Sequence, residues 1–264
     1  MNSRSKISRR FIFIACAFFW WVCTGCGPRS ETPVSSPPSS QEPPAAPDWF
    51  VFRPSFQTDE GEVYAGTAFP IRLPGYDRPV ILTAIHLLGP GGGMSRDVPP
   101  AEIPKVVKGL RLHDCFDVQR TMTFASEPLV IQEAAPLGAS GRAGDIVAFW
   151  APKKEELHCV EMSVAASKRG EPVWLVASVV SGAPADQRLH PARVMGMEDG
   201  YLLYQYENPK VSKQATSGAP VINQSGRLVA INLGGFESDG QMVGIGNPVG
   251  RFRKYLETAA AARR

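Results

Sequence analysis

From Trp49 onward the chain is a succession of short β-type runs separated by Gly, Pro and Asp, and this pattern constrains the fold more than any other feature. Such runs with turn signals between them are typical of a β-sandwich or barrel. A convincing amphipathic helix is predicted only at 248–262, after the last strand. The sequence therefore predicts an antiparallel all-β domain closed by a C-terminal α-helix. The predicted strands cover residues 51–56, 63–73, 80–84, 122–124, 129–131, 145–150, 173–180, 192–197, 201–206, 219–223, 228–233 and 242–245.

The first 25 residues carry the pattern of an export signal. A basic stretch at 4–10 precedes an apolar run at 11–22, which is too short for a comfortable membrane span and has the length of a signal-peptide core. The run ends in the sequence CTGC at 23–26, which resembles a bacterial lipoprotein cleavage box. The resemblance implies a signal peptide over 1–25, lipidation of Cys26, and an exported chain that is lipid-anchored to a bacterial membrane in the cell envelope. An uncleaved N-terminal anchor is the alternative.

Residues 26–48 are rich in Pro, Ser and Glu and offer few apolar side chains to bury. This composition is typical of a disordered, extended tether. We expect the tether to join the lipidated Cys26 to the body of the protein, 49–262, and to hold that body clear of a membrane surface.

The net charge of +3 gives no sign of a nucleic-acid partner. Four basic residues and no acidic ones lie in the first 25 residues, so the rest of the chain carries 24 basic and 25 acidic side chains. The excess of positive charge therefore belongs to the export signal, and we expect the body not to bind nucleic acid.

Cys115 and Cys159 are the two cysteines of the body. In an oxidising compartment they are able to form one disulfide, and two buried free thiols are the alternative. Neither belongs to a C-x-x-C pair, so the sequence predicts no zinc site.

Three segments carry side chains that suit nucleophilic catalysis. His86 ends one predicted strand, Asp145 begins another, and Ser217 precedes a glycine in a Gly/Pro turn. A serine hydroxyl is a poor nucleophile near neutral pH and needs an adjacent base, which an imidazole provides. A buried carboxylate fixes the tautomer of that imidazole and stabilises the imidazolium. We therefore predict a catalytic triad of His86, Asp145 and Ser217.

Each of these residues also has a simpler interpretation when it is taken alone. His86 is consistent with a histidine that only makes hydrogen bonds within a loop, and Asp145 with an acid that only caps a turn. Ser217 is consistent with an ordinary serine of a Gly/Pro turn. Asp114 and Asp117 compete with Asp145, although neither precedes so clear an apolar strand. The catalytic interpretation is preferred because base, orienting acid and nucleophile occur together.

These segments resemble the trypsin-like (chymotrypsin-fold) serine peptidases, especially their bacterial HtrA-type and glutamyl-endopeptidase-like branches. The order His, Asp, Ser is that of the family, with separations of 59 and 72 residues. The resemblance implies two antiparallel six-stranded β-barrels, 49–155 and 156–262, with the active site between them. It also implies peptide-bond hydrolysis through an acyl-enzyme, with a peptide or protein as substrate and with no cofactor or metal. The motifs that carry the resemblance are Gly66–Phe69, Thr83–His86, Gly144–Phe149 and Ala215–Val221.

The resemblance also implies an oxyanion hole made by the N–H groups of Ala215 and Ser217. The family usually has glycine two residues before the nucleophile, and this chain has Ala215 there. A methyl group restricts backbone torsions that glycine adopts freely. Two outcomes stay open: the hole assembles despite the methyl group, or it is collapsed and the fold is catalytically silent.

By the same resemblance, residues 231–234 form the strand that pairs with an extended substrate through backbone hydrogen bonds, and Val211 lies in the wall of the primary pocket. No acid occurs between Lys210 and Ala215, which argues against a preference for Lys or Arg. Val211 suits a neutral side chain, whereas Lys210 and Lys213 suit an acidic one, with His190 assisting. The four residues of the substrate-binding strand are Ile231, Asn232, Leu233 and Gly234.

The interval 88–114 differs from the rest of the body because glycines and prolines are dense in it. No Gly-Lys-Ser/Thr follows the glycines at 89–93, so a phosphate-binding loop is disfavoured. We expect a surface loop that borders the site of His86.

The sequence leaves two alternatives to a serine endopeptidase. One is a catalytically inactive member of the same fold that binds peptides. The other is an esterase of unrelated fold, which is disfavoured because those enzymes place the histidine last and use a Gly-x-Ser-x-Gly elbow. Residues 215–219 lack both of those glycines.

Overall fold

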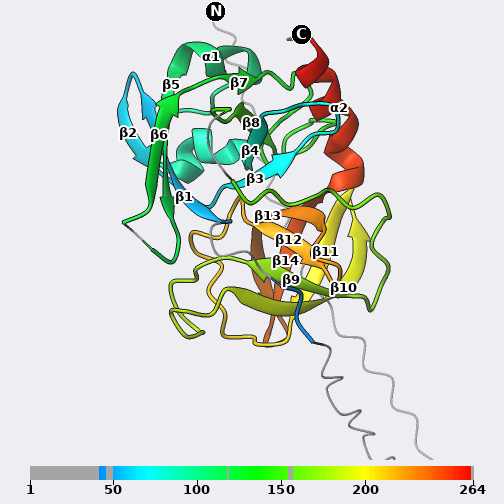
Figure 1. Ribbon diagram of the computed structural model, residues 1–264. Helices are drawn as coiled ribbons and strands as arrows, with labels where there is room; N and C mark the ends of the chain where they lie inside the picture. The colour runs from blue at the N-terminus through cyan, green and yellow to red at the C-terminus, as the bar shows by residue number, and fades with distance from the viewer. Residues whose placement is uncertain (1–41, 46–49, 118, 154–156, 263–264) are drawn as a thin grey trace, which may run out of the picture. The chain divides into compact units, whose positions relative to one another are not determined.

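The fold is described from a computed structural model, which places residues 42–45, 50–117, 119–153 and 157–262 (Figure 1). Over these residues the chain forms strands β1 to β14 and ends in the helix α2 (Val249–Ala261), as the sequence predicts. The strands are β1 (Phe52–Thr58), β2 (Gly61–Tyr64), β3 (Phe69–Arg72), β4 (Pro79–Thr83), β5 (Val107–Asp114), β6 (Thr121–Ala125), β7 (Pro128–Leu129), β8 (Val147–Trp150), β9 (Pro172–Val176), β10 (Leu189–Glu198), β11 (Tyr201–Tyr206), β12 (Pro220–Asn223), β13 (Leu228–Ser238) and β14 (Gln241–Pro248).

The second half of the body is a closed antiparallel barrel of six strands, in the order β10-β11-β14-β13-β12-β9. Alternating burial along β11 shows why the barrel closes, because Leu202, Tyr204 and Tyr206 point inward while the residues between them are partly exposed. The six-stranded barrel predicted for 156–262 is therefore present.

The first half differs in detail from the predicted six-stranded barrel. Its eight strands form two four-stranded sheets, β2-β1-β5-β6 and β3-β4-β8-β7, which an isolated bridge between Phe52 and Ala68 connects. Proline cannot donate a ladder hydrogen bond, yet Pro54 of β1 and Pro70 of β3 stay in register with Leu112 of β5 and Ile81 of β4. The first half thus consists of two four-stranded sheets and differs from the closed barrel of the second half.

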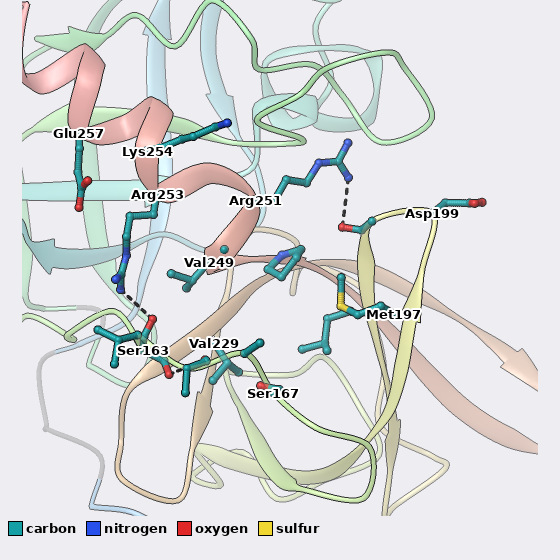
Figure 2. Close-up of a pocket in the computed structure, with 17 residues that line it drawn as sticks. Ser163, Ser167, Met197, Asp199, Val229, Val249, Arg251, Arg253, Lys254 and Glu257 are labelled. Carbon is teal, nitrogen blue, oxygen red and sulfur yellow. Dashed lines mark hydrogen bonds between the residues drawn. The ribbon is translucent and has the colours of Figure 1, made fainter.

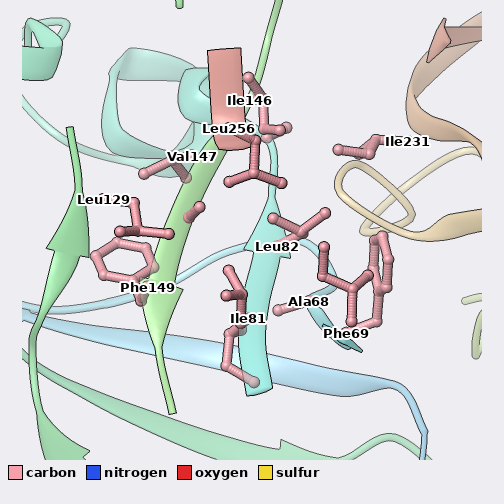
Figure 3. Packing of buried hydrophobic residues seen from close by; sticks show 14 of the residues in the cluster. Ala68, Phe69, Ile81, Leu82, Leu129, Ile146, Val147, Phe149, Ile231 and Leu256 are labelled. Atoms are coloured by element: carbon pink, nitrogen blue, oxygen red, sulfur yellow. The ribbon is translucent and has the colours of Figure 1, made fainter. Parts of the chain in front are cut away.

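The helix α2 packs against β7 of the first half and against β13 and β14 of the barrel. Its buried residues, Val249, Phe252, Leu256 and Ala260, recur every three or four positions and so form one apolar stripe. Figure 3 shows Leu256 of α2 and Ile231 of β13 in the same cluster as the buried side chains of β3, β4 and β8. Full burial of each large apolar side chain contributes about 1.5–3 kcal/mol, so this cluster fixes the strand ends that carry the site.

The interval 88–114 is more regular than the surface loop that the sequence predicts. It contains two short 3-10 turns, η2 (Pro90–Gly92) and η3 (Pro100–Glu102), a one-turn helix α1 (Ile103–Val106) and the whole of β5. The predicted loop is therefore wrong for its second half.

The tether and export predictions lie mostly outside the described residues, including the signal at 1–25 and Cys26. Of the predicted tether, residues 42–45 are placed against the body: Pro44 is buried, and Gln224 Nε2 donates to the carbonyl of Glu42 at 2.5 Å. Within the placed part of the chain, no helix has the length and apolar character needed to cross a membrane.

Candidate active site

His86 and Asp145 meet at the ends of two neighbouring strands of the first half. His86 lies in the 3-10 turn η1 (Ile85–Leu88) after β4, and Asp145 lies just before β8, which pairs with β4. His86 Nδ1 lies 2.7 Å from Asp145 Oδ2, and the backbone N–H of His86 donates to Asp145 Oδ1 at 3.1 Å. Because a carboxylate only accepts, this contact places the imidazole proton on Nδ1 and leaves Nε2 as an acceptor, the tautomer that a general base needs.

The carboxylate of Asp145 is fully buried and held by a third hydrogen bond, from the N–H of Leu137 at 2.9 Å. The competing carboxylate, Asp114, is also buried, but its Oδ1 accepts from the N–H groups of Phe116 and Asp117. Asp114 therefore caps its own turn, and Asp145 is the acid that orients His86.

The loop before Asp145 is clamped by residues that the sequence analysis did not single out. The buried Asn247 of β14 donates through Nδ2 to the carbonyls of Ala143 (3.0 Å) and Asp145 (3.4 Å). Arg251 of α2 donates through Nη2 to the carbonyl of Gly141 at 2.8 Å. The second half thus fixes the acid that the first half contributes.

Figure 2 shows a separate cavity, of about 750 Å³, beside the start of α2. Val229 and Val249 form part of its apolar lining, and Arg251 at its edge donates through Nη1 to the carbonyl of Gly200 at 3.4 Å. No member of the predicted triad lines this cavity. The candidate catalytic residues therefore form no part of this cavity.

Ser217 lies against the strand end that leads to His86. The carbonyl of Ser217 accepts from the N–H of Thr67 at 2.7 Å. A Cβ added to Gly218 would lie 2.2 Å from Thr83 Oγ1 and 3.2 Å from the N atom of Ala84. Only glycine therefore permits this approach, and Gly218 also has a φ of +86°.

The hydroxyl of Ser217 donates to the carbonyl of Leu233 at 3.1 Å. Within the described part of the chain, no hydrogen bond joins Ser217 Oγ to His86. The structure thus brings His86 and Asp145 into direct contact and places Ser217 beside them, with its side chain turned to β13.

The predicted oxyanion donors are the backbone N–H groups on either side of Thr216. Over the described residues, neither the N–H of Ala215 nor that of Ser217 makes a hydrogen bond. Ala215 has a φ of +61°, in the left-handed region, at a cost of about 1–2 kcal/mol for a residue with a Cβ. The backbone therefore takes the glycine-like conformation in spite of the methyl group.

Buried polar groups hold the segment between the two donors. Thr216 accepts at both its carbonyl (2.8 Å) and its Oγ1 (3.0 Å) from Asn232 Nδ2, and Tyr204 donates its hydroxyl to Asn232 Oδ1 at 2.5 Å. All three residues are fully buried. Burial raises the pKa of Tyr204 well above its usual value, so the phenol stays a neutral donor.

The predicted substrate-binding segment, 231–234, is already paired at its beginning and less covered at its end. The backbone of Asn232 is already paired, because its N–H donates to Ala219 and its carbonyl accepts from Gly218. Ile231 is buried and pairs with Pro220 of β12. That pairing ends at Ile231, so Leu233 and Gly234 lie on the part of β13 that β12 leaves uncovered.

Val211 and His190 are not placed as the sequence predicts. Val211 is buried in the core of the barrel, and its side chain contributes to packing. His190 is buried too, with Nε2 2.9 Å from the carbonyl of Ala177, and burial lowers its pKa. Of the basic residues named for the pocket, Lys213 has its Nζ 2.6 Å from the carbonyl of Gly235, next to the uncovered end of β13.

The glycine-rich turn borders the site of His86, as the sequence predicts. A Cβ added to Gly91 would lie 3.4 Å from His86 Cδ2, in van der Waals contact. The side chain of His86 keeps 20% of its surface exposed. The turn therefore covers one edge of the imidazole and leaves another accessible.

Cys115 and Cys159 are free thiols, so the possible disulfide between them is not formed. They have different surroundings: Cys115 lies near Arg53 and Ser178, and Cys159 lies near Arg72. Burial raises the pKa of the Cys115 thiol to about 12, which makes it unreactive as a nucleophile.

The fold is similar to those of several solved proteases. The HtrA-type protease AlgW, determined with a tripeptide, aligns with a TM-score of 0.51 and 12% identity over 80% of this chain and 60% of that one. A serine endoprotease from Yersinia pestis aligns with a TM-score of 0.52 and 14% identity, over 82% and 65%. The active form of the Rv3671c protease from M. tuberculosis aligns with a TM-score of 0.51 and 15% identity, over 89% and 93%.

No protein-family model and no curated protein matches the sequence. The chain spans 60% to 65% of the lengths of the AlgW and Yersinia chains. At such low sequence identities, the structural similarity to these proteases establishes the fold alone. The protein has the all-β, chymotrypsin-like fold with a C-terminal helix.

Proposed function

We propose that this protein is a serine endopeptidase that hydrolyses peptide bonds through an acyl-enzyme on Ser217. The observation that carries the proposal is the contact of His86 with the fully buried Asp145, next to the Ser217–Gly218 turn. Enzymes that catalyse acyl transfer combine a buried carboxylate that fixes an imidazole tautomer with a nearby serine and with backbone N–H groups that can receive an oxyanion.

The proposed reaction begins with a rotation of the Ser217 side chain from the carbonyl of Leu233 to Nε2 of His86. His86 takes the hydroxyl proton as Ser217 Oγ attacks the peptide carbonyl, and the N–H groups of Ala215 and Ser217 receive the oxyanion. The protonated imidazole then gives its proton to the leaving amine as the C–N bond breaks. Water, deprotonated by His86, hydrolyses the resulting ester and restores Ser217.

The uncovered end of β13 is the proposed docking edge for the substrate. β12 stops pairing at Ile231, and the carbonyl of Leu233, which now accepts from Ser217, becomes available when the serine rotates. An extended peptide added beside Leu233 and Gly234 gains main-chain hydrogen bonds without a preformed deep pocket. Lys213, which now donates to Gly235, is then released to meet the substrate.

A fluorophosphonate probe tests this proposal because it reacts only with an activated serine. We expect the wild-type chain to give an adduct on Ser217, identified by peptide mass spectrometry, and S217A to give none. S225A, which changes an exposed serine at the turn between β12 and β13, serves as the matched control and should label like the wild type. A folded wild-type chain that does not label would contradict the proposal.

The turned-away hydroxyl of Ser217 favours one competing function, that of an inactive peptide-binding module. In that case the probe leaves Ser217 unmodified, and an extended peptide binds with the same Kd to the wild type and to S217A without being cleaved. In the proposed peptidase, S217A binds the peptide and the wild type cleaves it.

We further propose that the chain is exported and anchored to a bacterial membrane through a lipid on Cys26, on the basis of the CTGC sequence at 23–26. A clickable fatty acid fed to expressing cells is expected to label the wild type and C23A but not C26A. Equal labelling of C26A and the wild type would overturn this anchor.

A further inference from the structure

Arg53 of β1 connects the first half of the body to the loop that carries the oxyanion donors. Its Nη1 donates to the carbonyl of Ala215 at 2.5 Å, and its Nη2 donates to the carbonyl of Ser178 at 2.5 Å. Nη1 also lies 3.3 Å from the carbonyl of Gly66 and 3.4 Å from Thr67 Oγ1. One partly buried guanidinium thus binds three backbone carbonyls from segments far apart in the sequence.

The carbonyl of Ala215 is the point at which this contact acts on the site. It receives a second hydrogen bond, from Thr67 Oγ1 at 2.9 Å, so that two donors from the first half hold it. With the carbonyl fixed, the left-handed φ of +61° determines where the N–H of Ala215 points. Among the residues that the structure describes, that N–H makes no hydrogen bond, as an oxyanion donor requires.

We propose that Arg53 is a positioning residue that keeps the oxyanion hole assembled by anchoring the carbonyl of Ala215; the inference rests on the proposed peptidase function. Glycine adopts a positive φ without strain, whereas alanine tends to leave it. The hydrogen bonds from Arg53 and Thr67 compensate for the missing glycine by fixing the peptide that follows Ala215. The two halves of the fold therefore share the oxyanion hole as well as the triad.

A guanidinium suits this role better than an ammonium. Its planar fork directs separate N–H groups to separate acceptors, here the carbonyls of Ala215 and Ser178. A lysine places one ammonium at the end of a flexible chain and cannot reproduce both contacts in this geometry. Arg53→Lys is therefore expected to behave as a defective variant and not as a conservative one.

The test is the kcat and KM for a fluorogenic peptide, together with the rate of fluorophosphonate labelling, in R53M, A215G and R53M/A215G. Loss of one oxyanion donor lowers kcat by about 100- to 1000-fold, and Thr67 still holds Ala215 in R53M, so we expect R53M to lose about 10- to 100-fold in kcat. KM should change little because the uncovered edge of β13 is untouched. A215G in the R53M background should restore most of the loss, since glycine needs no anchor.

R111M is the matched control, because Arg111 lies on the adjacent strand β5 with a partly exposed side chain that pairs with Glu62. It should keep kcat within about threefold, as surface ion pairs contribute little. An unchanged kcat in R53M, or a loss that A215G does not restore, overturns the inference. If R53M does not fold, R53K and R53K/A215G decide in the same way. A folded wild type without labelling overturns the proposed function, and this inference falls with it.

Discussion

Asp145→Asn is expected to lower kcat/KM for peptide hydrolysis by about 10⁴-fold, because it forces a choice between two damaged sites. Asp145 Oδ2 accepts from His86 Nδ1 and from the N–H of Leu137, and Oδ1 accepts from the N–H of His86. An amide has one oxygen. If its NH₂ faces the imidazole, His86 is driven to the tautomer that cannot act as a base; if it faces the backbone of His86, a buried donor loses its partner at a cost of about 1–3 kcal/mol.

Asp114→Asn is the matched control for this prediction. Asp114 is also buried, but its Oδ1 caps the turn at Phe116 and Asp117. Over the described residues its Oδ2 has no hydrogen-bond partner, so replacing that oxygen by an amide nitrogen breaks no hydrogen bond. We expect D114N to retain kcat/KM within about threefold, since the hydrogen bonds of the Asp114 carboxylate serve its own turn and the contact between His86 and Asp145 is unchanged. The comparison is made by progress curves with a fluorogenic peptide. Equal losses in D114N and D145N would show that burial, not contact with His86, matters.

The sequence predicts the barrel and the closing helix well because both leave a strong local pattern. The strand predicted at 201–206 is observed as β11, and the helix predicted at 248–262 is observed as Val249–Ala261. The sequence analysis does not predict β5, because the glycines and prolines that precede it indicate a loop. Its alternation, with buried Leu110 and Leu112 flanking the partly exposed Arg111, is a signal that was present in the sequence.

The site is predictable only as far as its chemistry is carried by local motifs. His86, Asp145 and Ser217 each stand beside a recognisable strand or turn, so their order along the chain suggests their roles. For Val211 the sequence-based prediction is wrong. The sequence predicts a side chain in the wall of the primary pocket, and the structure places that side chain in the packed core of the barrel. Whether an apolar side chain faces a pocket or a core depends on the closure of the barrel, which a local pattern does not contain.

The residues that hold the site in place leave no sequence signal at all. Arg53 and Ala215 are 162 positions apart, and Arg251 and Gly141 are 110 apart. An arginine in a strand or on a helix is normally a solvated surface residue. Only the three-dimensional structure shows that these two guanidinium groups bind backbone carbonyls near the proposed triad, where they connect the halves of the fold.

Gly218→Ala is expected to destabilise the folded protein by about 3 kcal/mol or more, with a fall in Tm of about 6–12 °C and loss of fluorophosphonate labelling. The added Cβ would lie 2.1 Å from the carbonyl of Thr67 and 2.2 Å from Thr83 Oγ1. The Thr67 carbonyl already accepts from Thr83 Oγ1 at 2.7 Å, so the clash also breaks a buried hydrogen bond. The φ of +86° adds backbone strain for any residue with a Cβ.

Two further glycine variants separate the clash from the strain. Gly226 has a φ of +71° but nothing within 4 Å of an added Cβ, so G226A should cost only about 1–2 kcal/mol and keep full labelling. Gly250 in α2 has an ordinary φ and open space, so G250A should stabilise the protein by about 0.5–1 kcal/mol. Urea unfolding of the three variants gives the ranking. If G218A and G226A have the same free energy of unfolding, backbone strain alone accounts for both losses. The close approach of Gly218 to Thr67 and Thr83 would then not restrict the residue type at position 218.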